Sequence, residues 1–135
     1  MGLPAFKDAW VQAFVNAINN NANYADAAKT WEGDFLFIVE PEGNLKETIQ
    51  FWVDLWHGKA REGKEIPVGQ TKTAAYTVNG KYNNWILVLS KKLDPIQALM
   101  QGKLKLKGDM GKVMRAVKAA QELVVSTTMV DTQFY

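Results

Sequence analysis

The chain offers few residues for nucleophilic, acid–base or metal chemistry. Its single histidine, His57, is followed by Gly58 and is predicted to lie in a turn, and there is no cysteine to complete a common zinc site. The two serines, Ser90 and Ser126, do not lie in the Gly-x-Ser-x-Gly pattern of a nucleophile elbow. We therefore predict neither a metal site nor a serine-based catalytic centre.

The carboxylates and glycines give no stronger indication of a catalytic or phosphate-binding site. Asp34 and Asp54 could face each other across a predicted hairpin, but paired carboxylates perform acid–base chemistry only when burial separates their pKa values. The glycines between 102 and 111 match neither the dinucleotide-binding nor the Walker phosphate-binding pattern. These absences predict a protein that is not an enzyme and requires no cofactor.

Composition is typical of one small domain with a substantial core. The chain has 135 residues, of which 47% are hydrophobic, and the aromatic residues include five Trp, four Tyr and six Phe. A net charge of +2 gives no argument for nucleic acid. No apolar run approaches the roughly 20 residues that span a bilayer, and the N-terminus lacks the pattern of a signal peptide. We expect a cytoplasmic protein.

The elements that would position a site can be expected from apolar periodicity. Phe6, Trp10, Phe14 and Ile18 recur every four residues and predict an amphipathic helix with an aromatic face. Residues 58–70 are rich in Gly, Lys and Glu, which favours a solvated loop. The expected elements of the N-terminal two thirds are helices over 4–19, 24–31 and 82–89 and strands over 35–39, 46–57 and 71–78.

The predicted strand 46–57 has two apolar faces. Ile49, Phe51, Val53 and Leu55 form the natural core face, and Trp52 and Trp56 lie on the other. An apolar patch of this kind usually marks a contact. In order of preference, we expect cover by the N-terminal helix or the C-terminal tail, then a second subunit, then a membrane.

Residues 93–118 combine three elements and their boundaries. Asp94-Pro95 is a helix start, because Asp caps a helix and Pro fits its first position, and Gly102 ends that helix. Alternation over 103–107 predicts a strand with lysines on its wet face. After Gly108-Asp109, apolar residues at helical spacing predict a further helix: Met110, Val113, Met114 and Val117.

Positive charge is concentrated in this segment. Residues 91–118 carry eight basic and two acidic side chains, whereas residues 1–90 carry eight and ten. Such a patch could attract anionic lipid headgroups or the phosphates of a coenzyme A ester. Alternatively, Lys103, Lys105 and Lys107 only protect an edge strand from aggregation. No nucleic-acid motif accompanies the patch.

The motifs "KLDP" and "MQGKLKLKGDMG", with the helix that follows, resemble the C-terminal signature of the sterol carrier protein 2 (SCP-2) family. The resemblance is closest over 93–111 and extends weakly back to about Gly33. It implies an α+β fold: a five-stranded, mostly antiparallel sheet with helices packed on one face around a hydrophobic tunnel. The family often has glycine where this chain has Lys91, and phenylalanine where it has Leu99-Met100. The implied organisation is one domain over 1–135, with N-terminal helices in 1–31, the family core in 33–124 and a tail, 125–135, as a possible lid.

The resemblance implies a non-catalytic protein that binds or transfers a fatty acid, fatty acyl-CoA, phospholipid or sterol. An interaction module that keeps the fold without lipid transfer is the alternative, and a domain acting on acyl-CoA comes third. The protein could be a monomer or a homodimer, with transient contact to an anionic membrane. The possible lid residues are Val124, Met129, Val130 and Phe134. The implied tunnel residues are Phe51, Val53, Leu89, Met100, Leu104, Leu106, Met110, Val113, Met114 and Val117.

Overall fold

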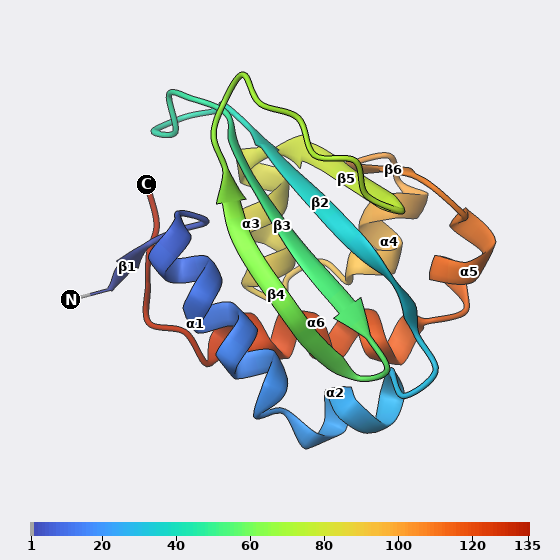
Figure 1. The fold of residues 1–135 in the computed structure, drawn as a ribbon. Coiled ribbons are helices and arrows are strands. Elements are labelled where there is room, and N and C mark those ends of the chain that lie inside the picture. The colour runs from blue at the N-terminus through green and yellow to red at the C-terminus, as the bar shows by residue number, and fades with distance from the viewer. Residues whose placement is uncertain (1) are drawn as a thin grey trace.

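Strands with apolar residues at alternating positions pair into one mixed sheet in the computed structural model, which describes residues 2–135 (Figure 1). The sheet has the order β4-β3-β2-β5-β6, in which β2 pairs parallel to β5 and the other neighbours are antiparallel. This confirms the α+β fold with a five-stranded, mostly antiparallel sheet. Its strands are β2 (Glu32–Glu40), β3 (Ile49–Trp56), β4 (Lys59–Ile66), β5 (Tyr76–Lys81) and β6 (Leu104–Lys107).

Helices cover one face of the sheet and leave the other open, as Figure 1 shows. The predicted start of α4 is correct: the Asp94 carboxylate accepts hydrogen bonds from the backbone N–H groups of Ile96 and Gln97, at 2.9 and 3.2 Å. Asp109 caps α5 in the same way. The helices are α1 (Asp8–Asn19), α2 (Ala22–Ala27), α3 (Tyr82–Leu89), α4 (Pro95–Met100), α5 (Met110–Met114) and α6 (Val117–Thr128).

The predicted loop over 58–70 is wrong, because most of it forms β4. The exposed positions of this edge strand are polar, and its buried positions beside α1, Ala60 and Gly63, are small instead of large and apolar. The Gln12 side-chain amide donates to the Gly63 carbonyl (2.7 Å), and the Asn19 amide both donates to and accepts from the backbone of Ala60 (2.9 Å each). A Cβ at Gly63 would lie 2.6 Å from a Val15 methyl, so glycine permits this close approach. Helix side chains thus satisfy an edge that would otherwise need another strand.

The two faces of β3 are those expected, but the cover over its outer tryptophans is different. Trp52 is 7% exposed, and its indole N–H donates to Asp34 at 2.7 Å. Ile66 packs beside it, and the Lys72 ammonium lies 4.1 Å from the ring centroid. Intramolecular cover is therefore correct for Trp52, but it comes from neighbouring strands and the β4–β5 connection instead of α1 or the tail. Trp56 is 37% exposed.

Three predicted elements have different bounds. The helix expected over 24–31 begins earlier because the Asn21 side chain caps α2, accepting from the Tyr24 backbone N–H at 3.1 Å. β5 passes through the predicted break at Gly80, where glycine allows Leu104 of β6 to approach. The single helix expected after Asp109 divides into α5 and α6, because Ala116 leaves helical geometry at φ −102°, ψ 40°.

The two ends of the described chain lie together, which the sequence did not indicate. β1 (Leu3–Pro4) pairs in parallel with β7 (Thr132–Gln133), and both lie at the left of Figure 1. The Tyr135 hydroxyl donates to the Ala5 carbonyl at 2.7 Å. These contacts hold the C-terminal residues across the end of the helical layer.

Candidate functional site

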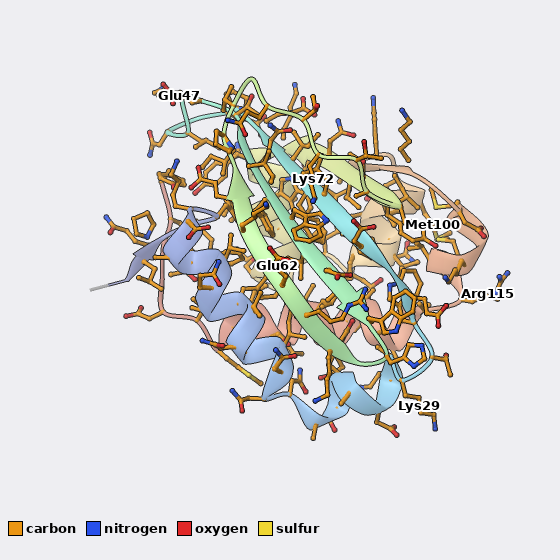
Figure 2. The ribbon with its side chains drawn as sticks, viewed as in Figure 1. Lys29, Glu47, Glu62, Lys72, Met100 and Arg115 are labelled. Atoms are coloured by element: carbon orange, nitrogen blue, oxygen red, sulfur yellow. The ribbon has the colours of Figure 1, made fainter. Side chains whose placement is uncertain are left out.

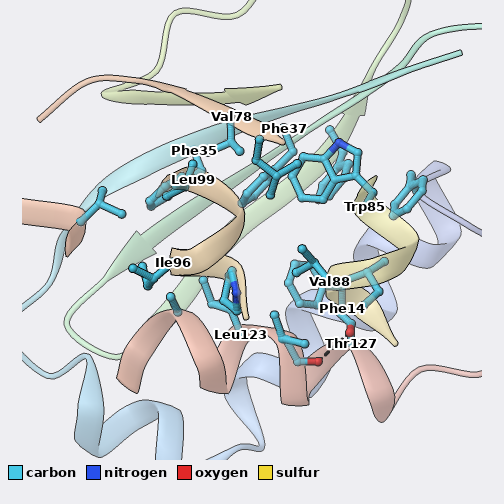
Figure 3. A pocket seen from close by; sticks show the side chains of 18 of the residues that line it. Phe14, Phe35, Phe37, Val78, Trp85, Val88, Ile96, Leu99, Leu123 and Thr127 are labelled. Atoms are coloured by element: carbon cyan, nitrogen blue, oxygen red, sulfur yellow. Dashed lines mark hydrogen bonds between the residues drawn. The ribbon is translucent and has the colours of Figure 1, made fainter. Parts of the chain in front are cut away.

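An apolar cavity of about 120 Å³ lies between the helix-covered face of the sheet and the helices (Figure 3). Strands β2 and β3 contribute side chains from their core faces, α4 and α3 from the left and the right of the view, and α6 from below. Its lining comprises Phe6, Trp10, Phe14, Phe35, Phe37, Phe51, Val78, Trp85, Val88, Leu89, Pro95, Ile96, Leu99, Leu104, Val113, Ala120, Leu123, Val124 and Thr127.

Aromatic rings form the wall on the sheet side because strand alternation aims every second residue at the helices. Phe37 is central: its ring centroid lies 5.5 Å from that of Phe35 and 4.9 Å from that of Phe51, both in stacked arrangements. Trp85 of α3 meets Phe37 edge-on at 5.9 Å. Such ring pairs are worth about 0.5–1.5 kcal/mol beyond their buried area. The wall is therefore a firmly packed surface.

The polar atoms of the lining already have partners in the chain. The Trp10 indole N–H donates to the Thr132 hydroxyl at 2.8 Å, and the Trp85 indole N–H donates to the Ile38 carbonyl at 3.1 Å. The Thr127 hydroxyl donates to the Val124 carbonyl at 2.6 Å. Within residues 2–135, no Asp, Glu, Lys, Arg or His lines the cavity. The cavity can therefore take up apolar groups from water, but the described residues of its lining offer no free polar atom to recognise a polar group.

Six of the ten predicted tunnel residues lie outside the lining. Phe51, Leu89, Leu104 and Val113 do line the cavity. Val53 is fully buried in the core, and Leu106 and Met114 pack against it, but these three are outside the lining.

Three further predicted tunnel residues face solvent. Met100, Met110 and Val117 are 63%, 40% and 38% exposed. Helix α4 faces the cavity through Ile96 and Leu99, so Met100, one position later, points away. Because the helix is interrupted at Ala116, Val117 does not lie on the same helical face as Val113. These positions correct the prediction of a methionine-lined tunnel.

The proposed lid residues lie at one end of the cavity. Val124 belongs to α6 and lines the cavity itself. Met129, Val130 and Phe134 line an adjoining hollow of about 500 Å³, which shares Trp10, Leu89 and Thr127 with the cavity. Only residues 129–135 lie beyond the last helix, since α6 continues to Thr128.

Another hollow, of about 340 Å³, adjoins the opposite part of α6. It shares Val88, Pro95 and Val124 with the apolar cavity, and charged side chains also line it, including Lys91 and Lys118. Lys91 belongs to the basic segment over 91–118, for which the sequence indicated attraction to lipid headgroups or the phosphates of a coenzyme A ester. The apolar cavity is thus bordered by two hollows with polar rims.

Apart from Phe51, the aromatic residues of the cavity were missed as site residues although their pattern was visible. Trp10 and Phe14 lie on the aromatic face predicted for the first helix, and Phe6, which precedes α1, is 1% exposed with φ 67°. Phe35 and Phe37 alternate on β2. The aromatic periodicity of α1 and of β2 was visible in the sequence. Whether the aromatic faces of these two elements meet depends on tertiary structure.

A buried polar cluster fixes the position of α6 behind the cavity. The Asn21 amide nitrogen donates to the Glu122 carboxylate and to the Ser126 hydroxyl, at 3.2 and 3.1 Å. Lys118 pairs with Glu122 at 3.0 Å. The hydrogen bond from Lys118, against the opposing effect of burial, together with that from Asn21, lowers the pKa of Glu122. The cluster joins the α1–α2 junction to the helix that forms the cavity floor.

The single histidine lies at the β3–β4 turn, away from this cavity. His57 adopts left-handed backbone geometry, with φ 50°, and its Nε2 lies 2.6 Å from the Glu32 carboxylate. Both side chains are about half exposed. Among the residues that the structure describes, no three His, Cys, Asp or Glu side chains are grouped to hold a metal ion.

Solved structures of similar architecture include a sterol carrier protein. The chain is similar to a crystal structure of sterol carrier protein 2, with a TM-score of 0.84 and 33% identity over 93% of this chain and 98% of that one. It is also similar to a solution structure of a conserved hypothetical protein from Thermus thermophilus, described as possibly a sterol carrier protein. There the TM-score is 0.86 and the identity 32%, over 98% of this chain and 95% of that one.

Residues 14–121 match the SCP-2 sterol transfer family, and the chain belongs to this family. It is also 31% identical over 108 residues to hydroxysteroid dehydrogenase-like protein 2 of Xenopus tropicalis. That match covers 80% of this chain and 24% of the relative, so the chain spans about a quarter of the length of the curated relatives it matches. The resemblance of the C-terminal motifs is thereby confirmed. Within residues 2–135, no helix has the length and apolar character needed to cross a bilayer.

Proposed function

We propose that this chain is a non-catalytic lipid-binding or transfer protein whose apolar cavity receives the hydrocarbon part of a fatty acid, acyl-CoA, phospholipid or sterol. The observation that carries the proposal is the cavity lining: aromatic and aliphatic side chains surround it, and its polar atoms are paired within the chain. Each methylene group moved from water into such a space contributes about 0.8 kcal/mol. Affinity then depends on chain length, with little need for polar recognition.

Binding of a whole lipid chain requires the cavity to widen. Its volume of about 120 Å³ is below the roughly 300–1,000 Å³ of most ligand pockets. The adjoining hollow of about 500 Å³ supplies the missing space if the boundary at Leu89 and Thr127 opens. We propose that the tail, with Met129, Val130 and Phe134, acts as the lid over this end. The proposed unit is a single domain over 1–135 that works in the cytoplasm.

An experiment that fills the cavity tests the proposal. Ala120 lines the cavity on α6, so Ala120→Phe would place a ring where the ligand chain is expected. Ala22, exposed at the start of α2, gives the matched control Ala22→Phe. We expect Ala120→Phe to weaken binding of a fluorescent fatty acid at least tenfold, equivalent to about 1.4 kcal/mol, and the control to leave it unchanged. Equal binding by the wild type and Ala120→Phe would contradict the assignment of the cavity.

Native mass spectrometry with organic extraction complements the variant. A fatty acid, acyl-CoA or phospholipid that copurifies at near one per chain would support the proposal and identify the ligand class. The same spectrum separates monomer from homodimer. A protein that copurifies with no lipid and takes up neither added fatty acid nor acyl-CoA would contradict it.

One observation favours the alternative of an interaction module without lipid transfer. The small volume of the cavity means that the interior is largely packed, as such a module requires. However, the proposed contact surface is reduced, because Trp52 is covered within the chain and only Trp56 is substantially exposed. The alternative predicts a dimer in which Trp56 is buried.

A further inference from the structure

The two edges of the sheet differ in how they are covered. At the β4 edge, α1 supplies hydrogen bonds from Gln12 and Asn19 to the strand backbone. Along the part of the chain that the structure describes, no helix side chain bonds to the backbone of β6 itself, and Asn84 of α3 donates only to the Lys103 carbonyl, just before the strand. Lys103, Lys105 and Lys107 are exposed there. We use the name basic edge for residues 100–115, which comprise the end of α4, β6 and α5.

Positive charge on the basic edge is not neutralised within the chain. Lys103, Lys105, Lys107 and Arg115 form no ion pair with any side chain of residues 2–135. The carboxylate of Asp109, the acidic residue of this segment, caps α5. A surface with several unpaired cations attracts an anionic partner at a range set by the ionic strength.

Large apolar side chains stand among these cations. Met100 is 63% exposed and Met110 40% exposed. Figure 2 shows Met100 and Arg115 on the same side of the molecule, beside α4 and α5. Exposed methionines in the same segment as exposed lysines suit an interface with both apolar and charged contacts, because lysine stems can lie along apolar surface while their ammonium groups reach the anions.

The basic edge continues directly into the cavity wall. Leu99, next to Met100, lines the cavity, as does Leu104 between two of the lysines. Val113 of α5 lines it as well. The same short segments therefore present cations and methionines outward and the cavity wall inward.

We propose that the basic edge is the face that docks on an anionic lipid bilayer, with Met100 and Met110 entering between the headgroups. The inference rests on the proposed lipid-binding function and names the surface at which lipid would be exchanged. A bilayer fits better than an acidic peptide, because the methionines project from the surface and none of the described hollows is lined by Lys103, Lys105 or Lys107. Docking through this edge keeps the cavity close to the membrane.

Charge reversal tests the electrostatic part. We compare the triple variant Lys103→Glu, Lys105→Glu, Lys107→Glu with a control of equal charge change, Lys29→Glu, Lys46→Glu, Lys59→Glu, whose lysines are exposed elsewhere. The probe is cosedimentation with phosphatidylcholine vesicles containing about one third phosphatidylserine. Each lysine near such a surface raises the affinity for the vesicles about fivefold, so the affinity of the basic-edge variant should be at least about 100-fold lower. The control should lose far less.

A second pair of variants tests the apolar part. Val68 is 64% exposed on the β4–β5 connection and matches Met100 in exposure. We expect Met100→Ser to weaken vesicle binding several-fold and Val68→Ser to leave it unchanged. Equal effects of these two substitutions would contradict insertion at the basic edge.

Three results would overturn the docking proposal: wild-type binding by the basic-edge variant, equal losses in both triple variants, or no binding of the wild type to anionic vesicles. The last result would point to an acidic protein partner. Fatty-acid uptake measured without vesicles separates this failure from failure of the proposed function. We expect the basic-edge lysine variant to take up fatty acid as the wild type does, since these lysines lie outside the cavity lining.

Discussion

Phe51 and Trp52 are neighbours on β3 and are almost equally buried, at 3% and 7% exposed, yet they belong to different kinds of surface. Phe51 faces the helices and packs among the aromatic rings that line the cavity. Trp52 faces outward, where a carboxylate accepts its indole N–H and ammonium groups lie over its ring. Burial alone therefore does not identify a binding site. A residue of the binding site lines the cavity, whereas a buried residue outside it is covered by polar partners.

The largest expected effect comes from removing the centre of the inner face. The Phe51 ring lies within 4.9–6.4 Å, centroid to centroid, of the rings of Phe6, Trp10, Phe14 and Phe37. We expect Phe51→Ala to lower the free energy of unfolding by about 3–5 kcal/mol, because the transfer energy is lost and a larger void remains. Chemical denaturation checks this value. A loss below about 1 kcal/mol would mean that the aromatic wall is not packed as described.

A smaller effect is expected on the outer face. Trp52→Phe keeps an aromatic ring but removes the hydrogen bond to Asp34, which also accepts from the backbone N–H of Ala75 at 2.8 Å. A hydrogen bond to a charged group is worth about 1.5–3 kcal/mol, and the partial exposure of this site favours the lower value. We expect unchanged fatty-acid affinity, in contrast to Ala120→Phe. Loss of binding in Trp52→Phe would remove the functional distinction between the faces.

The smallest of these effects concerns the carboxylate of the helical layer. Because the pKa of Glu122 is lowered in the folded protein, its contribution to stability is present above its unfolded pKa of about 4.3 and is lost as the pH falls through the lower folded value. We expect Glu122→Gln to cost about 1 kcal/mol at neutral pH.

Thermal unfolding as a function of pH checks this expectation. The difference in melting temperature between wild type and Glu122→Gln should shrink below about pH 4.3. A difference that stays constant down to about pH 3 would contradict a role for the charged form.

Local periodicity explains which elements could be predicted. The core face of β3, helix α3 and the Asp94 cap of α4 follow from residues within a few positions of one another. The strand β4 could not be predicted in this way, since its buried positions beside α1, Ala60 and Gly63, are too small to give an apolar alternation. The pairing of β1 with β7 involves two residues on each side, too few for a pattern.

The site was harder to predict than the fold for a geometric reason. The resemblance implied three methionines in the tunnel, but a cavity wall depends on helical phase, and one position separates the lining Leu99 from the exposed Met100. Phe37 and Trp85 meet only because α3 packs across β2. The family resemblance correctly indicated the fold, whereas the lining residues needed the relative placement of helices and sheet.

The most direct test of the central claim is the affinity of the protein for saturated fatty acids as a function of chain length. The apolar cavity predicts that affinity for acids between about eight and eighteen carbons rises by up to about fourfold per methylene, until the available space is filled. Calorimetric titration, with Ala120→Phe as reference, measures the slope. Affinity independent of chain length, or no binding of any acid in the series, would contradict a lipid-binding role for the cavity.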